Sequence, residues 1–203
     1  EQELLNRISA SLNEGKLAYQ AINTAQEAKS IKGFGLLTTK PLIVAANIDE
    51  SSILSSSDIE NEISQAIGNN TKVISICAKL EAELSEMNPE DEMEFRSELN
   101  IEESGINRLV SASYESLGLI TFFTTGPDET RAWSIKNGTE AQVAAGQIHS
   151  DIQRGFIRAE IISYEALIES GNESKARTNG LLRQEGKNYT MRDGDVVNFL
   201  FNV

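Results

Sequence analysis

The sequence predicts an α/β protein in two parts, and three observations support this fold class. Two apolar runs, at 42–46 and 73–78, flank a segment with helical periodicity. The order strand, helix, strand within about 35 residues is the βαβ crossover of a parallel sheet. After Gly118 the chain becomes rich in β-branched and aromatic residues, in an order of strands and one helix that is typical of the β-grasp (ubiquitin-like) fold. We place the boundary between the two parts near Gly118.

Residues 1–23 are predicted to be helical. Gly15 interrupts this helix. The helix begins at Glu1 without a capping residue, so we expect it to be the end of a longer helical segment. Its apolar side chains recur at helical spacing, at Leu4, Leu5, Ile8 and Leu12.

The predicted βαβ crossover begins after a turn at 38–41, where Pro41 restricts the residue before it. Because residues 42–46 are all apolar, we expect a strand that is buried on both faces. Asp58 is the candidate cap of a helix over 59–67, which Gly68 ends. The second strand covers 73–78.

Residues 81–103 hold ten acidic residues and one basic residue, Arg96. This composition predicts a solvated helical face, with a helix restarting at Asn88-Pro89. A further helix is expected over 104–117.

The part after Gly118 is predicted to hold two hairpins. The first joins strands 119–124 and 131–135 around the turn 126–128, and the second joins 188–191 and 196–203 around 192–195. Between them we expect a helix over 140–152, a strand over 156–162 and a short helix over 164–169.

Charge and composition exclude several kinds of protein. The net charge of −13 is uneven, because residues 1–117 carry 9 Lys/Arg against 20 Asp/Glu and residues 118–203 carry 9 against 11. An acidic first part repels phosphate backbones, so we expect no DNA partner. Cys77 has no second cysteine for a disulfide, and His149 alone cannot make a His-rich zinc site. No apolar run approaches the roughly 18 residues of a membrane span, so we predict a cytoplasmic protein without membrane contact.

The first chemical motif, Asn-Ile-Asp-Glu at 47–50, follows the first predicted strand. Ligands of open α/β sheets bind beyond the carboxyl ends of strands. P-loop GTPases carry Asn-Lys-x-Asp at this place, whereas this chain has Ile48 and Glu50 in the Lys and Asp positions. The longer carboxylate does not match guanine, and a site that is matched to one base rejects another. The motif therefore favours adenine, and a polar strand-end turn without a ligand is the alternative.

The second motif is Cys77-Ala78-Lys79, at the end of the second predicted strand. GTPases place Ser-Ala-Lys here, with a backbone N–H that faces the base, and Ala78 keeps that N–H. The alternatives for Cys77 are a small buried apolar residue or a redox-sensitive thiol.

With these motifs the chain resembles the YchF-type (Obg-related) P-loop ATPase/GTPase family. The resemblance rests on Leu-Leu-Thr-Thr-Lys-Pro at 36–41, Asn-Ile-Asp-Glu, Cys-Ala-Lys-Leu-Glu-Ala-Glu-Leu at 77–84, Arg-Ala-Trp at 131–133, Gly-Phe-Ile-Arg-Ala-Glu at 155–160 and Asp-Gly-Asp-Val-Val at 193–197. It implies that 1–23 belong to a helical arm inserted in a nucleotide-binding (G) domain. It also implies that 24–117 are the C-terminal part of that domain and that 118–203 are a TGS domain.

The resemblance also implies an activity and a partner. A YchF-type protein would prefer ATP over GTP, depend on Mg²⁺ and associate with ribosomal RNA or protein. The residues that inherit base recognition are Asn47, Ile48, Glu50, Cys77, Ala78 and Lys79.

The chain departs from the family by lacking Gly-x-x-x-x-Gly-Lys-Ser/Thr and a DxxG-like motif. Backbone amides and the lysine of that phosphate-binding loop provide most of the nucleotide grip. We therefore expect no catalytic or metal-binding residue in this chain, no tightly bound nucleotide and no hydrolysis by the chain alone.

Cationic and aromatic residues alternate in the C-terminal part. Arg131, Arg154 and Arg158 are candidates for contact with a partner, since arginine and aromatic side chains together can stack on RNA. The alternative is an ordinary sheet with outward arginines. We expect Asp193-Gly194-Asp195 to be a turn rather than a metal loop, and His149 to have a structural or capping role.

These observations leave three hypotheses. The chain is a fragment of a YchF-type nucleotide hydrolase, or a non-catalytic TGS module that binds RNA or protein, or a regulator that lost its phosphate-binding loop. The pair of loops at 47–50 and 77–79 favours the first, because a TGS module alone has no need of them.

Overall fold

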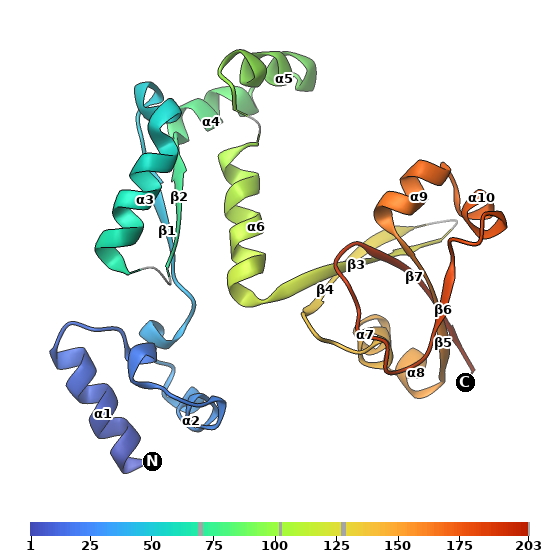
Figure 1. Ribbon diagram of the computed structural model, residues 1–203, viewed down its shortest axis with the longest axis horizontal. Coiled ribbons are helices and arrows are strands. Elements are labelled where there is room, and N and C mark those ends of the chain that lie inside the picture. Colours follow the sequence, from blue (N-terminus) through green and yellow to red (C-terminus); the bar gives the residue numbers. More distant parts are fainter. Residues whose placement is uncertain (69–70, 102, 127–128, 203) are drawn as a thin grey trace. The chain divides into compact units, whose positions relative to one another are not determined.

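The computed structural model describes residues 1–68, 71–101, 103–126 and 129–202 (Figure 1). The chain divides into two compact units, Glu1–Ser116 and Leu117–Val203. No helix among the described residues is long and apolar enough to cross a membrane.

The N-terminal unit begins with short helices around a small core of their own. These are α1 (Gln2–Asn13), η1 (Ala18–Ala21), α2 (Ala25–Ser30), η2 (Lys32–Phe34) and η3 (Leu37–Thr39). The helix predicted over 1–23 is therefore shorter, because Gly15 takes φ of 74° and ends the α-helical part. Arg7 joins the pieces by donating to the carbonyl of Ala21 and the carboxylate of Glu27, at 2.9 and 2.8 Å.

The predicted βαβ crossover is confirmed. Strand β1 (Ile43–Asn47) pairs in parallel with β2 (Lys72–Ile76), and η4 (Glu50–Ser55) and α3 (Ser56–Ile67) connect them. Figure 1 shows α3 alongside the two strands. Two details were predicted wrongly. Ala45 is exposed rather than buried, since the described residues give this sheet only two strands. Asp58 lies inside the first turn of α3 because the helix starts earlier, with Ser55 in the cap position.

Three helices complete the N-terminal unit: α4 (Ala78–Ser85), α5 (Pro89–Glu98) and α6 (Gly105–Leu117). As predicted, Asn88 caps α5, since its side-chain oxygen accepts from the N–H groups of Glu90 and Asp91 at 3.1 and 3.0 Å. The expectation that the whole acidic segment is solvated is wrong at Glu81, whose side chain is only 12% exposed.

The C-terminal unit is a mixed sheet with helices. Its elements are β3 (Leu119–Thr125), β4 (Thr130–Lys136), α7 (Ala141–Ile148), α8 (Ser150–Arg154), β5 (Phe156–Ser163), α9 (Tyr164–Ser170), α10 (Glu173–Thr178), β6 (Arg183–Glu185) and β7 (Asp195–Phe201). The sheet order is β4-β3-β7-β5-β6. Among the described strand pairs of this sheet, only β3 and β7 run parallel to each other. The predicted α/β class is confirmed, and the sheet of this unit is mixed.

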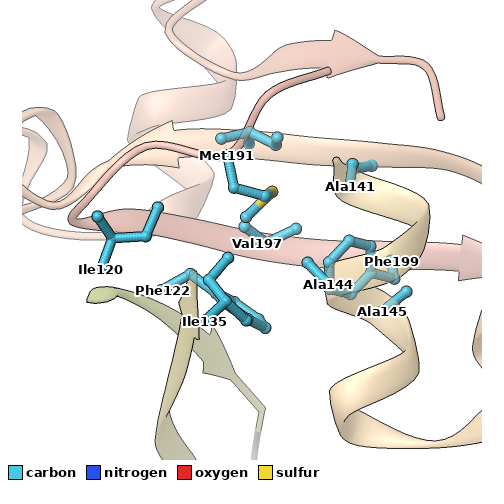
Figure 2. Close-up of a cluster of buried hydrophobic side chains, with 11 residues drawn as sticks. Ile120, Phe122, Ile135, Ala141, Ala144, Ala145, Met191, Val197 and Phe199 are labelled. Atoms are coloured by element: carbon cyan, nitrogen blue, oxygen red, sulfur yellow. The ribbon is translucent and has the colours of Figure 1, made fainter. Parts of the chain in front are cut away.

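The main core of this unit lies between α7 and the sheet. Figure 2 shows the three alanines of α7 beside Phe199 and Val197 of β7, with Met191 packed over the same strand. Phe122 of β3 is fully buried and meets Phe199 edge-on, with ring centroids 5.9 Å apart. The small side chains of α7 allow this close approach of helix and sheet.

The predicted C-terminal hairpin is wrong. Residues 188–191 form a single bridge, Glu140↔Thr190, and β7 pairs instead with β3 and β5. The physical reason is the turn before β7. The carboxylate of Asp195 accepts from the Arg192 N–H at 2.9 Å and from the Tyr189 hydroxyl at 3.0 Å, so the chain turns into the middle of the sheet. Strand β6, which the sequence analysis missed, is a short polar segment.

Candidate nucleotide-base site

The candidate site is built where β1 and β2 end. The last residues of the two strands, Asn47 and Ile76, face each other in register. The Ile48 N–H donates to the Ile76 carbonyl at 3.0 Å, and the Asn47 Oδ1 accepts from the Ala78 N–H at 3.1 Å. The Asn47 side chain therefore ties the two predicted motifs together.

A cavity of about 760 Å³ opens beside these motifs. Five of the six predicted base-site residues line it, namely Asn47, Ile48, Glu50, Cys77 and Lys79. The sixth, Ala78, gives its N–H to Asn47, so this amide has a protein partner where the sequence analysis expected it to face a base.

Cys77 and Lys79 differ in their surroundings. Cys77 is buried and packs with Leu80 and Leu84, as expected for a small apolar residue. The Lys79 side chain is 80% exposed and lies 3.8 Å from the carboxylate of Glu83. Cys77 thus contributes a buried part of the cavity lining, and Lys79 an exposed part.

Sequence reasoning missed a third part of the cavity wall, the turn Glu98–Asn100. This turn ends α5 in a Schellman motif, in which the Ile101 N–H donates to the Arg96 carbonyl at 2.9 Å and the Asn100 N–H to that of Ser97 at 3.1 Å. Asn100 takes φ of 54°, a conformation that asparagine tolerates well. The asparagine after a helical run was the signal that could have revealed the turn.

The cavity is rich in hydrogen-bond acceptors. Among its described lining residues the carboxylates of Asp49, Glu50 and Glu98 stand against one cation, Lys79. Carboxylates only accept hydrogen bonds when ionised. The cavity therefore suits the part of a ligand that carries N–H and O–H donors, and it disfavours a phosphate.

Two carboxylates outside the cavity hold its walls in place. Glu81 accepts from Arg96 at 2.9 and 3.3 Å and from the Gly105 N–H at 2.8 Å, which links α4, α5 and α6. Burial would raise the pKa of Glu81, but these hydrogen bonds and the Arg96 charge hold it below the usual value.

Glu60 links α3, β2 and α6 in a similar way. It accepts from the N–H and hydroxyl of Ser75 at 2.7 and 2.6 Å and from Arg108 at 2.5 Å. Burial would raise the pKa of Glu60, yet the Ser75 and Arg108 hydrogen bonds lower it overall.

The described residues contain no group of three or more His, Cys, Asp or Glu side chains that could hold a metal ion.

The structure does not bring the three candidate partner arginines together. Arg131 stacks over Trp133 on β4, with its guanidinium carbon 4.3 Å from the ring centroid. Arg154 ends α8 and pairs with Asp151. Arg131 lies on the same face of β4 as the core residues Trp133 and Ile135, whereas Arg158 pairs with Leu200 on the opposite sheet face.

Two smaller expectations for this unit hold. His149 caps α8, since its Nδ1 accepts from the Asp151 N–H at 3.2 Å. Residues 193–194 form a turn directly before β7, in which the Asp193 carboxylate accepts from the Thr121 N–H at 2.7 Å.

Comparison with known proteins identifies the family. A family model named YchF-GTPase_C, described as "Protein of unknown function (DUF933)", matches residues 119–202. The chain is 43% identical over 206 residues to the "Ribosome-binding ATPase YchF" of Bacillus subtilis, in an alignment that covers 100% of this chain and 56% of that protein. The chain belongs to the YchF-type family.

Further YchF relatives match over a similar span. The "Ribosome-binding ATPase YchF" of Mycoplasma genitalium is 40% identical, with 98% of this chain and 56% of that protein covered. The YchF GTPase structure of Schizosaccharomyces pombe superposes with a TM-score of 0.81 at 29% identity, over 98% of this chain and 54% of that chain. A GTP binding protein from Pyrococcus horikoshii OT3, at TM-score 0.57 and 17% identity over 97% of this chain and 56% of that one, shares the fold. The chain thus spans about half the length of the YchF relatives it matches.

Proposed function

We propose that this chain carries the base-recognition and partner-binding regions of a YchF-type nucleotide hydrolase that associates with the ribosome in the cytoplasm. The observation that carries the proposal is the Asn47–Ala78 hydrogen bond, which joins two strand-end motifs beside an acceptor-rich cavity. The relatives' names, ribosome-binding ATPase and GTPase, support the nucleotide and the partner.

We infer a preference for ATP over GTP from the same motif. Glu50 lines the cavity where a GTPase would offer the shorter aspartate, and Ile48 replaces the lysine. The aspartate of GTPases accepts from two donors of guanine, N1–H and the exocyclic amine, and the longer Glu50 carboxylate does not match that distance, whereas adenine presents only its exocyclic amine as a donor. Ile48 also packs against the Cys77 cluster, which offers an apolar surface to a flat base.

Phosphoryl transfer would depend on residues outside this chain. The sequence has no Gly-x-x-x-x-Gly-Lys-Ser/Thr segment to cradle phosphates, and acids outnumber bases among the charged side chains that line the cavity. Mg²⁺, which neutralises the β- and γ-phosphates in such enzymes, would be held with those phosphates and not by this cavity.

We propose the domain assignment on the same basis. Residues 1–23 would belong to an inserted helical arm, 24–117 to the nucleotide-binding domain and 118–203 to a TGS-type β-grasp domain. The compact units 1–116 and 117–203 and the mixed sheet that α7 covers support this division.

A second function, a TGS module that binds RNA or protein without catalysis, is favoured by one observation in the C-terminal unit. Arg131 lies stacked on Trp133 at an edge strand, a pairing that can extend onto an unstacked base. The two functions are compatible within one protein.

Titration of the isotope-labelled chain with adenosine and with guanosine tests base recognition without phosphates. We expect adenosine to shift the amide resonances of Asn47 and Lys79 and to bind more tightly than guanosine. The double variant Ile48→Lys with Glu50→Asp should move the preference toward guanosine by about tenfold, the scale of an unsatisfied buried polar group. Equal affinities for both nucleosides in both proteins would refute the selector role of the 47–50 motif.

A further inference from the structure

Glu98 and Asn100 reach the candidate base cavity from a different element than the two motifs do. They belong to the turn that ends α5, whereas the motifs follow β1 and β2. Their side chains are exposed, while Leu99 between them packs into the Cys77, Leu80 and Leu84 cluster. The backbone of the turn is therefore anchored in a core, and its two polar side chains border the cavity.

Two kinds of contact fix the position of this turn. The Schellman hydrogen bonds set its backbone, and Arg96 in the last turn of α5 is held by Glu81 and Glu92. Glu81 in turn lies one turn after Cys77 in α4 and also accepts from the Gly105 N–H. The turn is thus tied to the helix that begins at the second motif.

The cavity is larger than a flat purine alone fills, at about 760 Å³, and falls in the size range of small-ligand sites. Glu50 already provides a carboxylate for the base. The remaining donors of a nucleoside are the ribose hydroxyls, and a second carboxylate, Glu98, can accept hydrogen bonds from them. Acidic side chains accept hydrogen bonds from ribose hydroxyls in other nucleotide sites. Asn100 offers both an acceptor and donors beside it.

We propose that the turn Glu98–Asn100 is a third nucleoside-binding element, in which Glu98 accepts hydrogen bonds from the ribose hydroxyls and Asn100 supports the same contact. This assignment rests on the base-recognition function proposed above. It makes the acidic segment after α4 part of the ligand site and not only a solvated surface.

The test compares adenosine with 2′,3′-dideoxyadenosine, which lacks both hydroxyls, on the 203-residue chain by amide chemical-shift titration. We expect the chain to bind adenosine about five- to tenfold more tightly than the dideoxy compound, the scale of one ordinary hydrogen bond. Glu98→Ala should bind the two compounds equally. Asn100→Gly, which keeps the turn conformation, should weaken the binding of adenosine but not that of the dideoxy compound.

The matched control is Glu94→Ala, which removes the same charge from an exposed position of α5 that does not line the cavity. It should keep the full preference for adenosine. If Glu98→Ala retains the preference, or weakens both compounds equally, the ribose assignment is wrong while base recognition stands. If the unaltered chain binds no adenosine, the proposed function fails and the inference fails with it.

Discussion

Arg96 donates two hydrogen bonds to the carboxylate of Glu81, from Nη2 at 2.9 Å and from Nη1 at 3.3 Å, and both side chains are only 12% exposed. This pair joins the last turn of α5 to the first turn of α4. Because Glu81 also accepts from the Gly105 N–H, a single carboxylate holds three helices of the N-terminal unit.

Replacement of Glu81 by Gln should therefore destabilise residues 1–116 at neutral pH. Loss of charge-assisted hydrogen bonds to a largely buried arginine should cost about 1–3 kcal/mol of unfolding free energy. The measurement is urea unfolding followed by far-ultraviolet circular dichroism. Trp133, the one tryptophan of the chain, reports separately on the C-terminal unit and should be unaffected.

The effect should depend on pH with a definite sign. The folded pKa of Glu81 is lowered, so its stabilisation is present above the unfolded pKa of about 4.3 and is lost as the pH falls through the folded value. The difference between the native chain and Glu81→Gln should shrink below about pH 4. Glu83→Gln is the control, since its exposed pair with Lys79 contributes about 0–0.5 kcal/mol. A difference that grows on acidification would contradict this account.

The parts of the fold that local sequence determines were predictable. Apolar residues dominate the runs that became β1 and β2, and Asn88-Pro89 carries its own cap. The β3–β7 pairing was not predictable, because it joins distant strands in parallel and the turn before β7 looks like a hairpin loop. Local turn chemistry does not specify which strand a chain meets next.

The candidate site shows the same division. The 47–50 and 77–79 motifs could be found because each follows its strand directly. The turn at Glu98–Asn100 could not, since its place depends on the tertiary pair Arg96–Glu81. Strict alternation would also put Phe156 and Arg158 on one face of β5. A register shift between them moves Arg158 to the opposite face, and no sequence pattern indicates that bulge.

Gly155 should not tolerate a side chain. A Cβ atom there would lie 2.0 Å from the backbone oxygen of Asn202. To avoid this clash, the start of β5 would have to move away from the segment that follows β7. Gly155→Ala should cost at least about 2 kcal/mol of C-terminal unit stability, as overpacking does. Unfolding followed by Trp133 fluorescence measures it.

The matched control is Gly186→Ala, where a Cβ atom meets nothing within 4 Å. Its effect should stay within about 0.5 kcal/mol, the usual range for surface changes. Equal stability of the two variants would show that the close approach of Gly155 and Asn202 does not affect the free energy of unfolding.

The 203-residue chain should not hydrolyse ATP by itself, because it has no phosphate-binding loop. Phosphate release over hours with Mg²⁺ present should equal that of buffer. A heat-unfolded sample of the same preparation serves as the control for contaminating enzymes. Steady turnover that disappears when the chain is unfolded would show that the proposal of phosphoryl transfer by residues outside this chain is wrong.

Residues 117–203 should fold alone and carry the ribosome contact. The unit has its own core around Phe122 and a near-neutral charge balance, and a unit of its size buries enough surface to be stable, if only marginally. Expressed separately, it should unfold cooperatively and sediment with ribosomes. Raised salt should weaken sedimentation if phosphate is the target. Arg158→Glu should weaken it further, because Arg158 is exposed on the sheet face opposite the α7 core.

Lys187→Glu makes the same charge change at an exposed turn of the same unit and separates a specific contact from net charge. If Arg158 touches the partner, its replacement should reduce sedimentation several-fold while the Lys187 variant behaves like the unaltered fragment. Equal losses in both variants would show a general effect of charge. An unfolded fragment would refute independent folding of 117–203. A folded fragment that never sediments with ribosomes would move the contact to residues 1–116 or to parts of YchF proteins outside this chain.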